Sequence, residues 1–174
     1  MLNLKPPEYL FCPFCGSNLR SKQMDGTGFK HCQNCDWTCY PHVGTASCGV
    51  VIKGNKVLLV KRAREPYKNT WMFPSGFVSY GEHPEDTIIR EMREETGLEV
   101  KVIKLLSVEQ VDDYPRSMGH FGFFYKVKVK GKLKPVDEEE NSDIGWFDLN
   151  KLPRIGWHGH QKMLRGLTRN LDLC

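Results

Sequence analysis

The sequence predicts an α/β (α+β) fold, in which a mixed sheet lies between helices and follows a small N-terminal module. Three observations support this prediction. Residues 1–42 contain two closely spaced cysteine pairs. From residue 43 onward, alternating apolar and polar residues mark several strands. One helical pattern follows Pro84 and a second covers Trp157–Leu171, which is typical of a sheet with helices packed on its faces.

The N-terminal cysteines form two C-x2-C pairs separated by sixteen residues, a spacing within the range of four-cysteine zinc sites. A segment this short cannot bury a core of its own, and tetrahedral thiolate coordination would stabilise it. Redox-active C-x-x-C pairs would need a thioredoxin-like strand and helix, which the sequence lacks. We therefore predict that residues 1–42 form a zinc ribbon, with structural Zn²⁺ bound by Cys12, Cys15, Cys32 and Cys35.

The cysteine content also indicates a compartment. Seven cysteines in 174 residues, with no signal peptide, fit a reducing compartment better than a secreted disulfide scaffold. No apolar run approaches the length of a membrane span. We therefore expect a cytoplasmic protein without a membrane partner. Cys39, four residues after Cys35, is either a substitute zinc ligand or a free thiol.

The strands of residues 43–174 are indicated by period-two patterns and by turn residues. Val43–Lys53 and Lys56–Lys61 are joined through Gly54 and Asn55, a two-residue hairpin signal. Further strands are predicted at Glu99–Gln110, Phe121–Lys130 and Ile144–Leu149, with a turn-rich loop at Val111–Met118. The segments Met72–Pro74 and Phe77–Ser79 bracket Gly76. Along the strand after residue 120, the side chains expected to share one face are Phe123, Tyr125, Val127 and Val129.

The central helix is indicated by its end signals and its apolar stripe. Pro84 suits the first helical position, and Gly97 suits a left-handed C-terminal cap. The apolar stripe consists of Ile88, Ile89 and Met92.

The same helix carries a row of carboxylates. Glu91, Glu94 and Glu95 stand at i, i+3 and i+4, so their carboxylates are expected to converge. Arg90 lies one turn before Glu94 and can orient that carboxylate. Like charges at this spacing repel by roughly 0.2–0.5 kcal/mol per pair, and carboxylates without nearby histidine or cysteine favour Mg²⁺ or Mn²⁺. A solvated acidic helix is the alternative interpretation.

The segment from Gly76 to Leu98 matches the pattern G-x5-E-x7-R-E-U-x-E-E-x-G-U, in which U is an aliphatic residue. This pattern is the Nudix box, so the chain resembles the Nudix hydrolases. The matching residues are Gly76, Glu82, Arg90, Glu91, Met92, Glu94, Glu95, Gly97 and Leu98. The resemblance implies an α/β/α sandwich formed by residues 43–174, and cleavage of a nucleoside diphosphate linked to another moiety.

The resemblance also implies roles for individual residues. Two or three divalent metal ions would be bound by the Gly76 carbonyl and by Glu91, Glu94 and Glu95. Either Glu91 or Glu94 would act as base towards the attacking water, and Arg90 completes the predicted catalytic set. Members of the family often place a further glutamate before a tryptophan such as Trp146. Glu140 is the candidate, with Glu139 or Asp143 as alternatives. A solvated acidic loop without a metal ion would have the same sequence pattern.

The zinc ribbon before the box resembles the NADH pyrophosphatase branch of this family. That branch carries S-Q-P-W-P-F-P-x-S after the box, whereas this chain reads S-V-E-Q-V-D-D-Y-P from Ser107. NAD(H), ADP-ribose and diadenosine polyphosphates therefore all stay open as the small-molecule nucleotide substrate. A purine base would stack on an aromatic ring. The candidates for this contact are Trp71, Phe73 and Tyr114.

The net charge of +4, with acidic and basic residues interspersed, does not indicate a nucleic-acid partner. Zinc ribbons often bind nucleic acid, however, so the alternative hypothesis is a non-catalytic nucleotide sensor with a nucleic-acid-binding ribbon. By analogy with its relatives, the ribbon is expected to serve as a dimerisation or lid element, which makes a homodimer one expected assembly.

Overall fold

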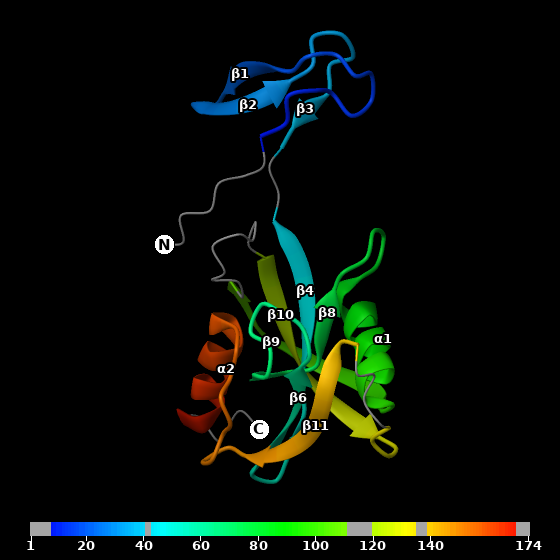
Figure 1. Cartoon of the computed structure of the whole chain (residues 1–174), viewed down its shortest axis with the longest axis vertical. Helices are drawn as coiled ribbons and strands as arrows, with labels where there is room; N and C mark the ends of the chain where they lie inside the picture. Colours follow the sequence, from blue (N-terminus) through cyan, green and yellow to red (C-terminus); the bar gives the residue numbers. More distant parts are fainter. Residues whose placement is uncertain (1–7, 41–42, 111–119, 135–138, 170–174) are drawn as a thin grey trace. The chain divides into compact units, whose positions relative to one another are not determined.

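The chain divides into two compact units in the computed structural model, residues 1–43 and residues 44–174 (Figure 1). The structure describes residues 8–40, 43–110, 120–134 and 139–169. Within these ranges, no helix is both long enough and apolar enough to span a membrane.

The N-terminal unit is a small antiparallel sheet in the order β1-β2-β3, formed by Arg20–Met24, Thr27–His31 and Thr38–Cys39. Asp25 and Gly26 join β1 to β2 with φ of 50° and 77°, as a tight hairpin turn requires. The residue after each C-x2-C pair also has a positive φ, 70° at Gly16 and 62° at Asp36. The chain therefore reverses directly after each cysteine pair.

Two sheets form the centre of the C-terminal unit. In the first, the strand order is β8-β4-β10-β9; β10 runs parallel to β4, and the other neighbours are antiparallel. In the second, the order is β11-β6-β5, and β7 also pairs with β6. The strands are β4 Gly44–Val50, β5 Ile52–Lys53, β6 Lys56–Arg62, β7 Trp71–Met72, β8 Ser75–Phe77, β9 Glu99–Gln110, β10 His120–Lys130 and β11 Asn141–Asp148.

Two helices cover the sheets of this unit: α1, Pro84–Thr96, and α2, His158–Arg169. The predicted end signals of α1 are confirmed, because Pro84 is its first residue and Gly97 adopts φ 73° while its N–H donates to Arg93. The His83 side chain caps the first turn by accepting from the Glu85 N–H at 3.3 Å. Figure 1 shows α1 and α2 on opposite sides of the strands, so the predicted α/β/α arrangement with a mixed sheet is confirmed.

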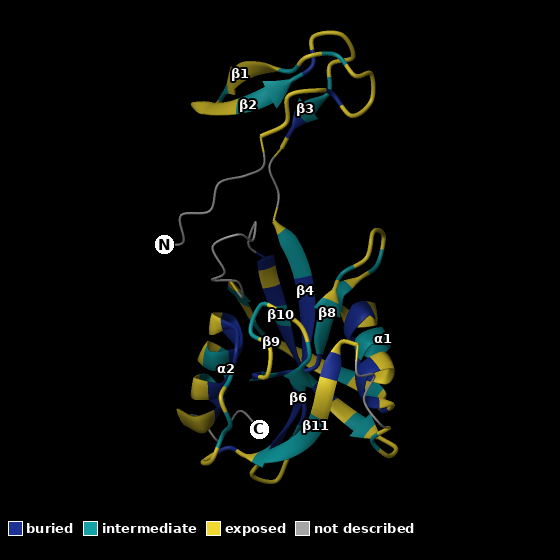
Figure 2. Ribbon diagram, in the orientation of Figure 1, coloured by how far each residue is buried: buried dark blue, intermediate teal, exposed yellow. Residues whose placement is uncertain are grey.

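The core follows the alternation of β10 (Figure 2). Phe124 belongs to the buried cluster that contains Leu164 and Leu167 of α2. The opposite face of β10 packs with Ile88 and Met92 of α1. All four residues predicted to share this second face do so: Phe123, Tyr125, Val127 and Val129.

Two short strands near Gly76 were not predicted from the sequence. The structure places them at Trp71–Met72 and Ser75–Phe77. Gly76 lies within β8, opposite Ser47 of β4. Pairing with β4 sets the position of β8, and the sequence around Gly76 gives no local signal for that pairing. The prediction for Val111–Met118 lies outside the described residues.

Candidate functional site

The C-terminal unit contains a cavity of about 560 Å³. Residues of the Nudix box and Glu140 contribute carboxylates to its lining. Several other elements contribute arginines, aromatic rings and apolar side chains. The lining residues that matter for function are Arg62, Arg64, Gly76, Phe77, Arg90, Glu91, Glu95, His120, Glu140, Asn141, Trp157 and His160.

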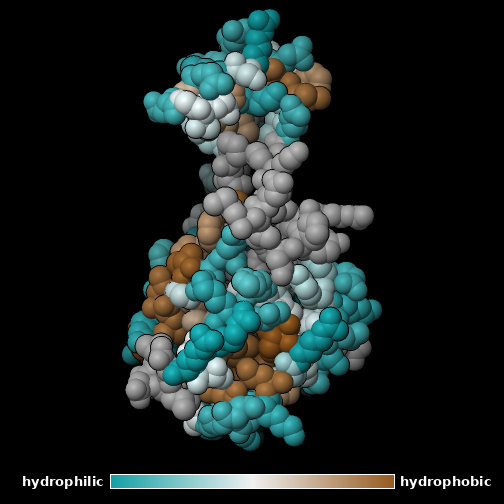
Figure 3. Space-filling model, turned by 90° about the vertical axis from the view of Figure 1, so that its left-hand side faces the viewer, coloured by the Kyte–Doolittle hydropathy of each residue, from teal (hydrophilic) through white to brown (hydrophobic). Residues whose placement is uncertain are grey.

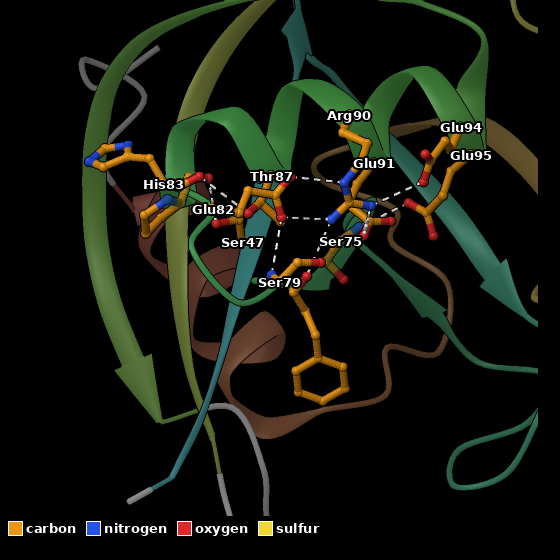
Figure 4. Close-up of polar contacts among 12 residues, drawn as sticks. Ser47, Ser75, Ser79, Glu82, His83, Thr87, Arg90, Glu91, Glu94 and Glu95 are labelled. Atoms are coloured by element: carbon orange, nitrogen blue, oxygen red, sulfur yellow. Dashed lines mark hydrogen bonds and ion pairs between the residues drawn. The ribbon is translucent and has the colours of Figure 1, made fainter.

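Arg90 is the centre of a hydrogen-bond network that joins the carboxylates of the Nudix box (Figure 4). Its Nε and Nη2 donate to the two oxygens of Glu82, each at 2.9 Å. Its Nη1 donates to Glu91 Oε1 at 2.6 Å and to Glu94 Oε2 at 3.1 Å. The hydrogen bond from Arg90 lowers the pKa of Glu82 to about 2, and the Ser79 backbone N–H acts in the same direction. Arg90 therefore orients Glu91 and Glu94, as predicted for Glu94.

Glu95 points away from Arg90 and is 7% exposed. Its Oε2 accepts from the Ser75 backbone N–H at 2.9 Å, and its Oε1 accepts from Asn141 Nδ2 at 2.7 Å. Burial raises the pKa of Glu95 to about 8 despite the Asn141 hydrogen bond, and the charge of Glu91 adds to this rise. Two poorly solvated carboxylates, Glu91 and Glu95, therefore face one cavity.

The three carboxylates do not converge as predicted. Glu91 and Glu94 meet on Arg90, whereas Glu95 is held by Ser75 and Asn141. Glu94 is more exposed than the other two, with a side-chain exposure of 58%, and it does not line the cavity. In the described part of the chain, only the four cysteines bring three or more potential metal ligands together. The physical reason is that Arg90 holds Glu91 and Glu94, whereas two residues outside the helix, Ser75 and Asn141, hold Glu95.

Gly76 lies directly against the carboxyl group of Glu91. A Cβ built at Gly76 would overlap the Glu91 Cδ and both of its oxygens. Because the conflict is with the carboxyl group itself, a side chain at position 76 has to displace a predicted metal ligand.

We therefore expect Gly76→Ala to move Glu91 and to weaken binding of the divalent ion by at least about tenfold. Titration of the purified variant with Mn²⁺, monitored by electron paramagnetic resonance, measures this affinity. Gly166→Ala serves as a control for replacing a glycine, since no atom lies within 4 Å of its built Cβ and its φ is not in the left-handed region. Unchanged Mn²⁺ affinity in Gly76→Ala would contradict the prediction.

Glu140 lines the same cavity from the loop before β11. Its Oε1 lies 3.7 Å from Arg64 Nη2, and its side chain is 63% exposed. The alternatives lie differently: Glu139 contacts Arg64 at 3.9 Å, and the Asp143 side chain accepts from the Ile144 backbone N–H at 2.8 Å. Of the three, only Glu140 is among the residues that line the cavity.

The four predicted zinc ligands lie together in the N-terminal unit. Sulfur–sulfur distances are 3.5 Å for Cys12–Cys35 and Cys15–Cys32, and 3.6 Å for Cys15–Cys35. Zn–S bonds of about 2.3 Å in a tetrahedron give sulfur–sulfur edges of about 3.8 Å. Hydrogen bonds with the side chain and then the backbone of Ser17 lower the pKa of Cys15 to about 5, which favours the thiolate. This arrangement fits a tetrahedral zinc ion and is consistent with a zinc ribbon. Cys39 is buried and is not part of the group.

Of the predicted base-stacking residues, Trp71 and Phe73 do not line the cavity. Phe73 is fully buried in the core, with an exposed fraction of 0%, so its assignment to substrate binding is wrong. Trp71 is half-buried and packs edge-on against Phe147 at a centroid distance of 4.4 Å. Tyr114 lies outside the described residues. The two box-adjacent aromatics were chosen by sequence proximity, but strand pairing directs Phe73 into the core.

Three other rings line the cavity, and the sequence analysis missed them. Phe77 contacts His120 at 5.2 Å between centroids, and His120 contacts Trp157 at 5.7 Å. The guanidinium carbon of Arg62 lies 5.4 Å from the Trp157 ring centroid. Burial lowers the pKa of Arg62, a half-buried cation on the cavity wall. Of the three, only Phe77 could have been found from the sequence, because it directly follows Gly76 of the box.

His160 of α2 also lines the cavity. Its Nδ1 accepts from the Phe73 backbone N–H at 3.1 Å, so the ring proton is on Nε2, which lies 3.9 Å from Cys48 Sγ. Burial lowers the pKa of His160 to about 3, and the charges of His120 and Arg62 add to the effect. His160 is therefore neutral in the folded protein at neutral pH.

This buried histidine is expected to make stability fall at acidic pH. The unfolded chain binds a proton at His160 below about pH 6.5, but the folded chain binds it only near pH 3. Its contribution is therefore fully present above pH 6.5 and is lost towards pH 3, at up to about 1.4 kcal/mol per pH unit. Urea unfolding of wild type and His160→Gln, compared at each pH, isolates this effect from the carboxylates. The stability difference between the two should narrow between about pH 6.5 and pH 5. A constant difference would contradict the prediction.

Comparisons with known proteins agree with this geometry. Residues 43–167 match the family model described as NUDIX domain. The chain is 37% identical over 131 residues to an ADP-ribose pyrophosphatase of Methanocaldococcus jannaschii, covering 75% of this chain and 76% of that protein. It is 33% identical over 150 residues to an NAD-capped RNA hydrolase NudC of Pseudomonas fluorescens, covering 85% of this chain but about half, 51%, of the relative.

The fold also has a solved counterpart. A crystal structure of a NUDIX hydrolase from Nitrosomonas europaea superposes with a TM-score of 0.80 at 21% identity, covering 94% of this chain and 93% of that one. At this identity the likeness supports the fold alone. The family model and the 37% identical relative carry the assignment further. The chain belongs to the NUDIX family of hydrolases.

Proposed function

We propose that the chain hydrolyses the pyrophosphate bond of a nucleoside diphosphate linked to another moiety, with ADP-ribose and NAD(H)-type dinucleotides as the substrate class. One observation carries this proposal: a single cavity is lined by carboxylates together with arginines and aromatic rings. The relatives support it, because their names specify an ADP-ribose pyrophosphatase and an NAD-capped RNA hydrolase.

The donor set fits Mg²⁺ or Mn²⁺ as cofactor. Glu91 and Glu95 face the cavity with pKa values raised by burial, so a divalent cation between them would relieve the cost of two desolvated charges. We assign the ion or ions to the Gly76 carbonyl and to the carboxylates of Glu91, Glu94, Glu95 and Glu140. When bound, Mg²⁺ would neutralise the charge of the diphosphate and polarise the phosphorus centre that water attacks.

The residues of the chain have separate roles in the reaction. Arg90 holds Glu91 and Glu94, one of which accepts the proton as the water oxygen bonds to phosphorus. The bridging oxygen leaves with the second phosphate. Arg62 and Arg64 line the same cavity and would bind phosphate oxygens. The rings of Phe77, His120 and Trp157 would stack the base.

We further propose that residues 1–42 are a structural zinc ribbon and that residues 43–174 are the catalytic domain. The match to the family model begins at residue 43, and the two compact units meet between residues 43 and 44. The four clustered thiols support zinc as the ion.

The substrate panel that tests the function consists of ADP-ribose, NADH and diadenosine polyphosphates, each with Mg²⁺. We expect release of mononucleotides, which chelation should stop and Mg²⁺ restore. Trp157→Ala should raise KM for the preferred substrate by about tenfold, since stacking of a base contributes roughly 1–3 kcal/mol. Binding of nucleotides without turnover over the whole panel would overturn the proposal and favour the sensor.

A further inference from the structure

Helix α2 carries three basic side chains on its exposed surface and no acidic residue along its length. Lys162, Arg165 and Arg169 are all exposed, whereas Leu164 and Leu167 are buried against the sheet. Figure 3 views the left-hand side of Figure 1, where α2 lies, and shows hydrophilic surface beside exposed hydrophobic surface on the C-terminal unit. A solvated helical face normally mixes both signs of charge, and α2 does not.

The basic side chains border a second cavity of about 490 Å³, which we call the α2 groove. It lies between β9 and α2, separate from the catalytic cavity. Its lining residues are Ser107, Glu109, Lys162, Met163, Arg165, Gly166 and Arg169. Nothing lies within 4 Å of a Cβ built at Gly166, so this glycine leaves the groove open where the helix passes it.

One of the three basic charges of the α2 groove is neutralised within it, because Lys162 pairs with Glu109 at 2.5 Å. Arg165 and Arg169, one turn apart, have no side-chain partner among the residues that the structure describes, although like charges at this spacing repel each other. The helix dipole favours a cation in the last turn and accounts for Arg169 there. The helix dipole does not account for Arg165 or for the open groove beside the two arginines.

The α2 groove and the catalytic cavity share one helix. Trp157 and His160, at the start of α2, line the catalytic cavity, and Arg169 ends the helix beside the groove. At 1.5 Å per residue, Trp157 and Arg169 are about 18 Å apart along the axis. The basic side chains of the α2 groove therefore lie further along the helix that begins at the catalytic cavity.

We propose that the α2 groove binds the phosphate backbone of a single-stranded RNA whose 5′-terminal nucleotide is cleaved in the catalytic cavity. This proposal rests on the proposed function. A guanidinium group binds phosphate in a bidentate manner, and the regularly spaced phosphates of a polyanion would pair with both Arg165 and Arg169. An anionic membrane fits less well, because α2 buries its leucines and has no apolar face to insert.

Binding is tested with a fluorescein-labelled, uncapped single-stranded RNA and the double variant Arg165→Gln/Arg169→Gln. We expect RNA affinity, measured by fluorescence anisotropy, to fall by about tenfold or more. The slope of log affinity against log salt should decrease by about 1.4, corresponding to two lost phosphate contacts. The matched control is Lys53→Gln/Lys56→Gln, which removes the same charge from exposed positions of β5 and β6. An equal loss of RNA affinity in both double variants would overturn the proposal. Wild-type RNA affinity in Arg165→Gln/Arg169→Gln would also overturn it.

Gly166→Glu is a second variant that separates charge from folding. Glutamate replaces glycine favourably within a helix by roughly 0.5–1 kcal/mol, and the site is sterically open. We expect its thermal unfolding midpoint to equal or exceed that of wild type while RNA binding is lost. Retained RNA binding in this variant, or tighter binding of wild type to phosphatidylserine-containing vesicles than to RNA, would contradict the proposed occupant.

Turnover distinguishes this proposal from the proposed function. In Arg165→Gln/Arg169→Gln, kcat/KM for an NAD-capped RNA should fall about tenfold, whereas kcat/KM for free ADP-ribose should stay within about twofold of wild type. Absence of turnover with every substrate would refute the proposed function and leave the binding experiment to decide on the groove. Equal loss with both substrates would show that the arginines act on the catalytic cavity and would refute the groove.

Discussion

Glu91→Gln is expected to lower kcat of pyrophosphate hydrolysis by about 10²–10⁴-fold, the range associated with loss of a general base or of a charged metal ligand. Glu91 lies on the cavity wall, contacts the Gly76 backbone closely and accepts a 2.6 Å hydrogen bond from Arg90. Glutamine preserves its size but removes the charge. Steady-state kinetics with saturating substrate and Mg²⁺ measures the loss.

Folding should survive this substitution. Burial raises the pKa of Glu91, so the ionised carboxylate is a cost to the metal-free protein. The matched control is Glu85→Gln, in the first turn of the same helix and exposed, which should keep wild-type kcat. Near wild-type activity of Glu91→Gln at every Mg²⁺ concentration would contradict the assigned site.

The same experiment separates the two candidate bases. Loss of a metal ligand is compensated by a higher Mg²⁺ concentration, because the ion still binds through the remaining oxygens. Loss of the base is not compensated, because the attacking water then has no acceptor for its proton. Comparing Glu91→Gln with Glu94→Gln over a Mg²⁺ titration should therefore show recovery in one variant and a persistent deficit in kcat in the other.

Removal of zinc is expected to unfold the N-terminal unit and leave the C-terminal unit folded. Structural zinc contributes apparent binding free energies of about 10–16 kcal/mol, far more than a three-stranded sheet of this size can supply by burial. A strong chelator, or Cys32→Ser, should therefore expose residues 8–40 to protease while a fragment containing residues 44–169 persists. Mass spectrometry of the limited digest identifies the cleavage sites.

The control for this prediction is Cys39→Ser. Cys39 is buried in β3 but lies outside the group of four, so this variant should retain one equivalent of zinc and its protease resistance. Zinc content is measured by inductively coupled plasma mass spectrometry. Full protease resistance of residues 8–40 in the zinc-free protein would show that the ion does not hold this unit together.

Features that depend on neighbours in the sequence were predictable. Pro84 and Gly97 delimit α1 as predicted, because capping is decided within one turn of the helix. Glu99–Gln110 is a strand over its predicted length. The cluster of four cysteines was also recognisable, since two cysteine pairs at a fixed spacing need no knowledge of the rest of the chain.

Features that depend on strand pairing were not predictable in the same way. Phe73 and Phe77 are both aromatic and flank Gly76, but the structure buries the first and exposes 63% of the second. Their separation follows from the pairing of β8 with β4, which leaves Phe77 beside His120 on the parallel neighbour β10. No period or motif near residue 76 contains that information.

The sequence by itself determined the family pattern, the capped carboxylate helix and the cysteine quartet, because each depends on residues at short, regular spacings. The tertiary structure alone decided what these groups face. Asn141 reaches Glu95 across 46 residues of sequence, and Lys162 reaches Glu109 across 53. The aromatic rings that line the catalytic cavity and the residues of the α2 groove likewise come from elements far apart in the chain. Packing of the sheets and helices brings these side chains together, and packing is a property of the whole chain rather than of any segment.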